Sequence, residues 1–295
     1  MATSTQPAPA QRRPRQESTT GSGVTFGRVL KSEWIKVTTV PSTVILIVCT
    51  VVVMVGLAAL FAWSVSITAD ALNDPDFPAE FRPPAEGPGS PGFDAFTAPS
   101  SGLVFGQLLI AALAVVLITS EWTTGMIRST MVAVPRRTPA LLGKVIVAAV
   151  IAFLVGFGSA LLSYLIAQPI LAGENIDFAI TEDGVFPSII NTGTYLALVA
   201  VLSMAIGILL RNTAGGVVTA VGIFFVLPLI VQLLSGLADW VMDAARFLPS
   251  FAGTQLVAIE IMDDDLTQWE GGLVMAAWAL GLLIVALLVA KKRDI

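Results

Sequence analysis

The sequence predicts an all-α membrane protein with six transmembrane helices, an N-terminal amphipathic helix at the membrane interface, and a re-entrant outer segment before the last helix. Three observations lead to this fold class. Hydrophobic residues make up 55% of the 295 residues and charged residues only 13%, whereas a soluble domain carries about 25% charged residues. Six apolar runs approach the roughly 20 residues that a helix needs to cross a bilayer. The basic and the acidic residues separate into alternate loops.

The six apolar runs form the predicted six-span domain over residues 41–295, and none of them contains Asp, Glu, Lys or Arg. If all six cross the membrane, 14 of the 16 basic residues fall on one side and 17 of the 21 acidic residues on the other. Basic residues near span ends stay in the cytoplasm, so both termini are expected there. The expected spans are residues 43–67, 101–119, 145–171, 194–210, 215–234 and 272–290.

The N-terminal part of the chain divides into two segments. Residues 1–23 are rich in Pro, Gln, Ser, Thr and Arg, a composition that predicts a disordered tail. Residues 24–40 predict an amphipathic helix in the inner headgroup layer. Glu33 falls on the apolar side of this helix, where it either pairs with Lys36 or contacts a partner protein, and the pair is favoured. The apolar stripe consists of Phe26, Leu30, Trp34 and Val37.

A polar segment, residues 120–144, separates the second and third runs. It predicts a short helix over Thr123–Val132, stopped by Pro135. Thr138 then caps the third span, with Pro139 at its first position. The basic side chains of this segment either bind anionic headgroups or contact a partner; they include Arg136, Arg137 and Lys144.

Two further features are expected near the acidic side. Gly222 and Pro228 predict a bend in the fifth span. Within residues 235–271, the stretch Phe251–Met262 is apolar but too short to cross, which predicts a re-entrant or interfacial segment.

Several chemistries are excluded by the residues themselves. The chain has no histidine and a single cysteine, Cys49, so it offers neither a histidine base nor an intrachain disulfide. The pair Gly143–Lys144 lacks the flanking residues of a P-loop. Ion-driven carriers place ionisable groups inside their spans, and these spans have none. We therefore expect a protein that is not an enzyme and binds no cofactor or metal. If it moves a substrate uphill, the energy must come from a second polypeptide.

The polar segment resembles the coupling loop of ABC-2 type exporter permeases. The sequence from Glu121 to Arg128, EWTTGMIR, continuing to Pro135-Arg136-Arg137 and Lys144, is similar to the E-x-x-x-G…P-x-R…K pattern of that family. This resemblance implies a permease subunit in a bacterial plasma membrane that exports a hydrophobic or amphipathic substrate. It further implies two copies of the permease, a homodimer, with two cytosolic ATPases that bind ATP and Mg²⁺, contacts with membrane lipid, and no nucleic acid.

By the same resemblance, the polar segment contacts the ATPase. Met126, Ile127 and Met131 would seat in a groove of that partner, while Glu121 and Arg128 would fix the register. The alternative is a membrane scaffold that recruits a soluble protein without transport. The candidate coupling residues are Glu121, Thr124, Gly125, Met126, Ile127, Arg128, Met131, Pro135, Arg136 and Arg137, and the interfacial helix adds Phe26, Leu30, Glu33, Trp34 and Val37.

Overall fold

A computed structural model describes residues 25–84, 87–125, 137–236, 240–259 and 265–292. Within these ranges the chain is helical and contains no strand. Six helical segments are long and apolar enough to cross a membrane, which confirms the predicted number. Each predicted run lies within one of them, and the second run begins at residues 101 and 102, just before α4. The predicted disordered tail, residues 1–23, lies outside the described residues.

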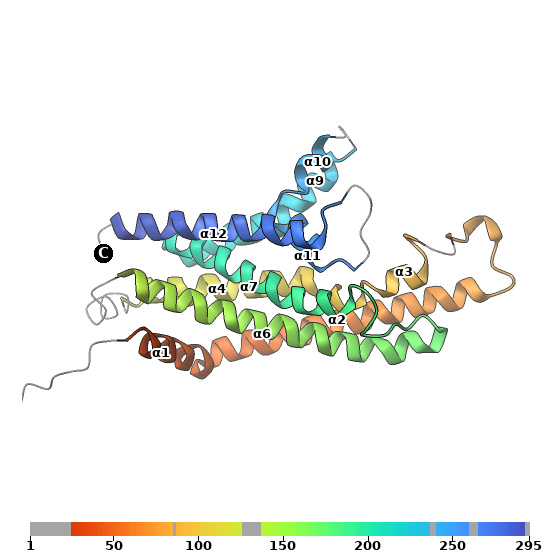
Figure 1. The fold of residues 1–295 in the computed structure, drawn as a ribbon, viewed down its shortest axis with the longest axis horizontal. Coiled ribbons are helices and arrows are strands. Elements are labelled where there is room, and N and C mark those ends of the chain that lie inside the picture. Colours follow the sequence, from red (N-terminus) through yellow and green to blue (C-terminus); the bar gives the residue numbers. More distant parts are fainter. Residues whose placement is uncertain (1–24, 85–86, 126–136, 237–239, 260–264, 293–295) are drawn as a thin grey trace, which may run out of the picture.

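The helices run nearly parallel or antiparallel, with both α1 and the end of α12 at one end of the bundle (Figure 1). Val40 separates α1 from α2, and Pro41 is the first residue of α2. The α-helices are α1 (Phe26–Thr39), α2 (Pro41–Asn73), α3 (Pro91–Ala95), α4 (Leu103–Thr123), α6 (Arg137–Leu171), α7 (Val185–Leu210), α8 (Thr213–Val221), α9 (Leu227–Leu234), α10 (Trp240–Ala245), α11 (Pro249–Val257) and α12 (Gln268–Lys292). Short 3₁₀ turns cover Ala79–Phe81, Ala98–Ser100 and Ala172–Glu174, and a π-helical turn covers Gly222–Val226.

Helix α7 lies at the centre of the bundle and packs against α4, α6 and α12. Small residues let these helices approach closely. At the α6–α7 crossing, a Cβ added to Gly156 would lie 2.8 Å from the carbonyl oxygen of Thr192, and one added to Gly193 would lie 2.8 Å from that of Phe153. No side chain fits between the two backbones there, so the crossing depends on this pair of glycines.

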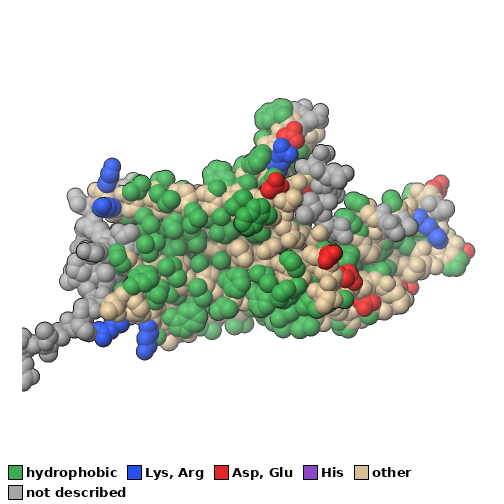
Figure 2. All heavy atoms as spheres, in the orientation of Figure 1, with side chains coloured by type: hydrophobic (Ala, Val, Ile, Leu, Met, Phe, Trp, Pro, Cys, Tyr) green, Lys and Arg blue, Asp and Glu red, His purple; other side chains and the backbone are tan. Residues whose placement is uncertain are grey.

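Charge separates along the bundle axis. One end is called the basic end here. It carries the N-terminus of α1, the end of α4, the start of α6, the α7–α8 turn, and Lys291 and Lys292 of α12 (Figure 1, Figure 2). The opposite, acidic end carries Asp and Glu side chains of the loops (Figure 2). The band between the two ends is covered by apolar side chains.

The fifth span is interrupted in the region where Gly222 and Pro228 predicted a bend. Its first part, α8, lies in the bundle, and the π-helical turn Gly222–Val226 then leads into α9. The segment formed by α9 and α10 projects from the bundle (Figure 1). Pro228 has no backbone N–H, so the carbonyl four residues earlier, that of Phe224, loses its helical donor.

Residues 235–271 contain the two short helices α10 and α11 in their described part, and neither is long enough to cross a bilayer. Helix α11 packs on α7 and α12. Backbone carbonyls at its C-terminal end accept hydrogen bonds from side chains of Ser188, Asn191 and Gln268. These neutral donors satisfy groups that would otherwise be buried without partners.

We expect Gly253→Ala to destabilise the fold, because the added Cβ would lie 1.9 Å from Cε2 of the fully buried Tyr195 ring. Overpacking of this kind costs about 1–3 kcal/mol. The matched control is Gly281→Ala in α12, where nothing lies within 4 Å of the added atom. Thermal unfolding of the purified protein, followed by tryptophan fluorescence, should show a lower midpoint for the first variant only. Equal midpoints would contradict the α7–α11 contact.

Candidate functional site

A cluster of four charged residues lies at the basic end, where α1, α4 and α6 meet. Helix α1 supplies Glu33 and Lys36, α4 supplies Glu121, and α6 supplies Lys144. We refer to these four residues as the charge cluster. Its two acids and two bases have a net charge of zero, which suits a position next to the apolar band of the bundle.

Each acid of the cluster contacts both lysines. The Nζ of Lys144 lies 2.6 Å from Glu33 Oε2 and 2.8 Å from Glu121 Oε1. The Nζ of Lys36 lies 2.7 Å from Glu33 Oε1 and 3.1 Å from Glu121 Oε1. All four contacts are charge-assisted hydrogen bonds. The cluster is therefore a closed network rather than a set of separate pairs.

Burial and mutual attraction act in opposite directions on these groups. Glu33 is 3% exposed, and Glu121 and Lys144 are each 6% exposed. Burial alone would raise the pKa of Glu33, but Lys144 and Lys36 outweigh it and hold the pKa below its usual value. For Lys36, burial would lower the pKa, but Glu33 and Glu121 raise it. Both pKa shifts favour the charged forms of Glu33 and Lys36.

The cluster fixes both ends of the connection between α4 and α6. Helix α4 ends at Thr123 and α6 begins at Arg137, and both helices are joined through the cluster to α1. Gly143 adds close packing beside Lys144, because a Cβ at this position would lie 3.0 Å from Cγ1 of Val29 in α1. Residues 124–136 are thus attached to a three-helix junction at both ends.

Some of the predicted coupling residues lie in the described parts of the chain, and the others do not. Glu121 is buried in the cluster, where its carboxylate binds two lysines of its own chain. Thr124 is exposed and caps α4, and Gly125 is exposed with a φ of 73°. Arg137 is the first residue of α6. The others lie outside the described residues: Met126, Ile127, Arg128, Met131, Pro135 and Arg136.

Three details of the polar segment differ from prediction. The expected helix Thr123–Val132 is wrong at its start, because Thr123 ends α4 and the left-handed φ of Gly125 interrupts a helix. Helix α6 begins at Arg137, before the predicted cap at Thr138. Lys144 was expected at headgroups or a partner, but it is buried against Glu33 and Glu121.

Helix α1 buries only part of the predicted stripe against the bundle. Val37 is buried and Leu30 partly buried, but Phe26 is 43% and Trp34 40% exposed. Glu33 is on the buried face, and its pairing with Lys36 is confirmed. Glu33 is buried because it also contacts Lys144 of α6. The residue pattern of α1 alone does not include that contact.

A second set of contacts holds the end of α4 from another side. The guanidinium carbon of Arg211 lies 4.1 Å from the centroid of a Trp122 ring, a cation–π geometry. Thr213 donates a hydrogen bond of 2.8 Å to the hydroxyl of Thr119. Both partners come from the α7–α8 turn. The sequence showed only a short basic turn there, so its contact with α4 was missed.

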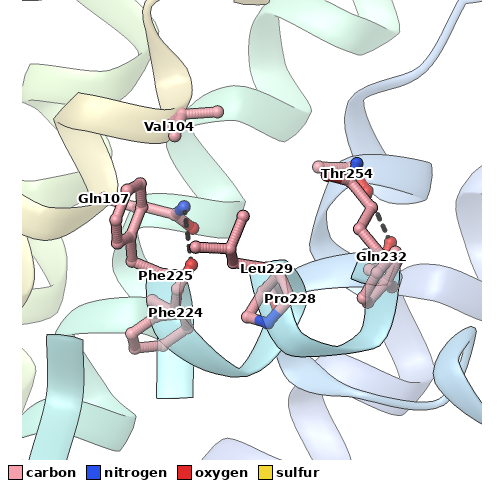
Figure 3. A pocket seen from close by; sticks show the side chains of 10 residues that line it. Val104, Gln107, Phe224, Phe225, Pro228, Leu229, Gln232 and Thr254 are labelled. Atoms are coloured by element: carbon pink, nitrogen blue, oxygen red, sulfur yellow. Dashed lines mark hydrogen bonds between the residues drawn. The ribbon is translucent and has the colours of Figure 1, made fainter. Parts of the chain in front are cut away.

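A cavity of 340 Å³ lies between α4, the π-helical turn, α9 and α11, on the side of the bundle from which α9 projects (Figure 1, Figure 3). Its lining is apolar and aromatic with a few neutral polar side chains and no charged residue. Gln107 enters from α4 and Phe224 from the π-helical turn, and the two are hydrogen-bonded (Figure 3). The other lining residues are Val104, Phe225, Pro228, Leu229, Gln232, Ser250, Phe251 and Thr254.

A comparison of the chain with protein-family models found no match, and a comparison with curated proteins found none either. The resemblance of the polar segment to the ABC-2 coupling loop is therefore still a prediction from its motif.

We expect Lys144→Met to destabilise the protein, because it leaves Glu33 and Glu121 sharing only Lys36. Removing one partner of a buried charge network costs about 3–5 kcal/mol. Lys31→Met, on the exposed face of α1, serves as the control and should change stability by less than about 0.5 kcal/mol. Thermal unfolding of the two purified variants compares them directly. If both unfold at the wild-type temperature, the charge cluster does not hold the junction.

Proposed function

We propose that this chain is the membrane-spanning permease subunit of an ATP-driven exporter of the ABC-2 type. In this proposal two copies of the chain assemble with two cytosolic ATPases. Residues 124–136 receive movement from the ATPase, and the bundle exports a hydrophobic or amphipathic substrate across a bacterial plasma membrane. ATP and Mg²⁺ bind to the partner chain, since the phosphate-binding loop is missing from this sequence.

The observation that carries the proposal is the attachment of residues 124–136 at both ends to the charge cluster. A segment that transmits force from a soluble partner needs a stiff base, because a slack loop would absorb the movement. Here one ionic contact of 3.1 Å joins α4 to α1, one of 2.6 Å joins α6 to α1, and one of 2.8 Å joins α4 to α6. A simple membrane anchor has no need of such a base.

The uncharged cavity supports the proposed class of substrate. Its apolar and aromatic lining favours an apolar body, while Gln107, Gln232 and Thr254 offer hydrogen bonds to a neutral polar group. A charged ligand would find no compensating charge in this lining and would pay a large desolvation cost. These features agree with a hydrophobic or amphipathic molecule.

The proposal places the basic end in the cytoplasm, because basic residues near span ends stay inside. We expect a cysteine at Ala2, in a Cys49→Ser background, to resist an impermeant maleimide in intact cells and to react after lysis. A cysteine at Asp76, in a loop of the acidic end, serves as the control and should react in intact cells. Labelling of Ala2→Cys in intact cells would show that the basic end faces outward and would contradict this orientation.

The direct test changes residues 126 and 127 and leaves the charge cluster intact. Met126→Asp or Ile127→Asp would put a charge into an apolar groove of the ATPase. If water is excluded from the contact, this weakens binding by several kcal/mol, about the cost of burying a polar group without a partner. Each variant should insert into the membrane and unfold at the wild-type temperature. Each should also lose copurification with a P-loop ATPase from native membranes, and lose transport.

The conservative variants Met126→Leu and Ile127→Val are the matched controls and should retain the complex. The chain purified alone should not hydrolyse ATP. Full complex formation by both aspartate variants would refute contact through this segment. Copurification of an ATPase without any transport would favour the scaffold alternative.

A further inference from the structure

Helix α4 and the fifth span lie side by side in antiparallel orientation and touch at three levels. Near the basic end, Thr119 of α4 bonds Thr213 of α8. Closer to the acidic end, Gln107 of α4 bonds the backbone carbonyl of Phe224. Gln107 and Thr119 are twelve positions apart, which corresponds to roughly 18 Å along a helix. Helix α4 therefore contacts the fifth span both at the start of α8 and at the π-helical turn.

The contact near the basic end is tightly defined. Arg211 has a φ of 52°, a left-handed conformation that costs a non-glycine residue free energy and persists where surrounding contacts hold it. Its guanidinium group lies over the Trp122 ring, 4.1 Å from the centroid. Asn212 caps α8 by accepting a hydrogen bond from the N–H of Gly215. The turn is thus fixed to the last residues of α4 on one side and to α8 on the other.

The middle contact leaves no free space between the two helices. A Cβ on Gly216 of α8 would lie 2.6 Å from Cγ1 of Val115 in α4. On the other side, a Cβ on Gly207 of α7 would lie 2.5 Å from Cγ2 of Ile118. The part of α4 near the basic end is enclosed by α7 and α8, so it cannot shift toward them without displacing them.

The third contact lies at the π-helical turn, where the fifth span departs from regular α-helix. Pro228 cannot donate to the carbonyl of Phe224, and the Nε2 of Gln107 donates to it instead at 3.3 Å. The Oε1 of Gln107 accepts from the hydroxyl of the fully buried Tyr195 in α7. Gln107 is thereby oriented by α7 and in turn orients the turn from which α9 departs. Breaks of this type are sites where helices change direction.

We infer that α4 is a lever which couples the basic end of the molecule to the bend in the fifth span, with Arg211 and Gln107 as its positioning residues. Displacement of the end of α4 moves α8 through Trp122–Arg211 and Thr119–Thr213. The same displacement acts on the π-helical turn through Gln107. The outcome is a change in the position of α9 and in the width of the cavity. This coupling belongs to the chain itself and does not depend on the proposed ATPase.

The test uses a reporter cysteine in the cavity and a change at the far end of α4. Gln232→Cys, in a Cys49→Ser background, places an exposed thiol on α9 in the cavity lining. Arg211→Gln then removes the cation over Trp122. We expect the rate of N-ethylmaleimide labelling of the purified protein to change by about threefold or more, a typical strength for coupling between distant sites.

Three variants separate coupling from general loosening. Arg211→Lys keeps a cation and should restore the parental rate. Ser120→Ala alters the same end of α4, but its exposed hydroxyl donates to the Leu117 carbonyl of its own helix, so the rate should not change. A second reporter, Glu80→Cys in an exposed loop of the acidic end, should label at one rate in every background.

Two further variants keep the test decisive if Arg211→Gln does not fold. Trp122→Leu removes the same contact from the α4 side and should shift the rate in the same direction. Gln107→Leu breaks the contact at the turn, and its effect should not add to that of Trp122→Leu, because both act through one helix. The inference is overturned if Trp122→Leu leaves the rate at Gln232→Cys unchanged, if the two effects add fully, or if both reporters change together.

Discussion

The ionic network between Glu33, Lys36, Glu121 and Lys144 is the interaction on which the rest of the basic end depends. If α1 lay in lipid with Glu33 on its apolar side, burying this carboxylate without a partner would cost free energy, because the group would lose its hydration. The cost is offset because two lysines approach within 2.6 and 2.7 Å of its two oxygens. Helix α1 therefore belongs to the bundle as a packed element, with its acid turned toward protein rather than headgroups.

Away from the basic end, buried polar groups are satisfied by neutral hydrogen bonds rather than by ion pairs. There, backbone carbonyls of the π-helical turn and at the C-terminal end of α11 accept hydrogen bonds from neutral side chains, those of Ser188, Asn191, Gln268 and Gln107. A neutral amide or hydroxyl is much cheaper to bury than an ion, so it suits positions further from water. The chain thus uses ions for rigid attachment at one end and neutral hydrogen bonds around the parts of the fold that bend.

Much of this arrangement could be predicted from the sequence, and the limit lies where contacts cross between helices. Six apolar runs predicted six long helices because length and hydropathy are local properties. The three-residue spacing of Glu33 and Lys36 predicted their pair for the same reason. Lys144 is 111 residues from Glu33 along the chain, and nothing local distinguishes it from a headgroup anchor. Likewise, Pro228 predicted a bend but not that Gln107 would supply the missing donor.

Two adjacent residues at the end of α4 connect the charge cluster to the α7–α8 turn. Glu121 enters the charge cluster with α1 and α6, whereas Trp122 packs under Arg211 of the α7–α8 turn. Consecutive residues on a helix point about 100° apart, so one turn of α4 contacts elements on two sides at once. A helix held in this way cannot rotate or slide toward one neighbour without disturbing the other. The polar segment that follows Thr123 is thus joined to a helix whose movement must be shared by the whole bundle, which is the property that a force-receiving segment requires.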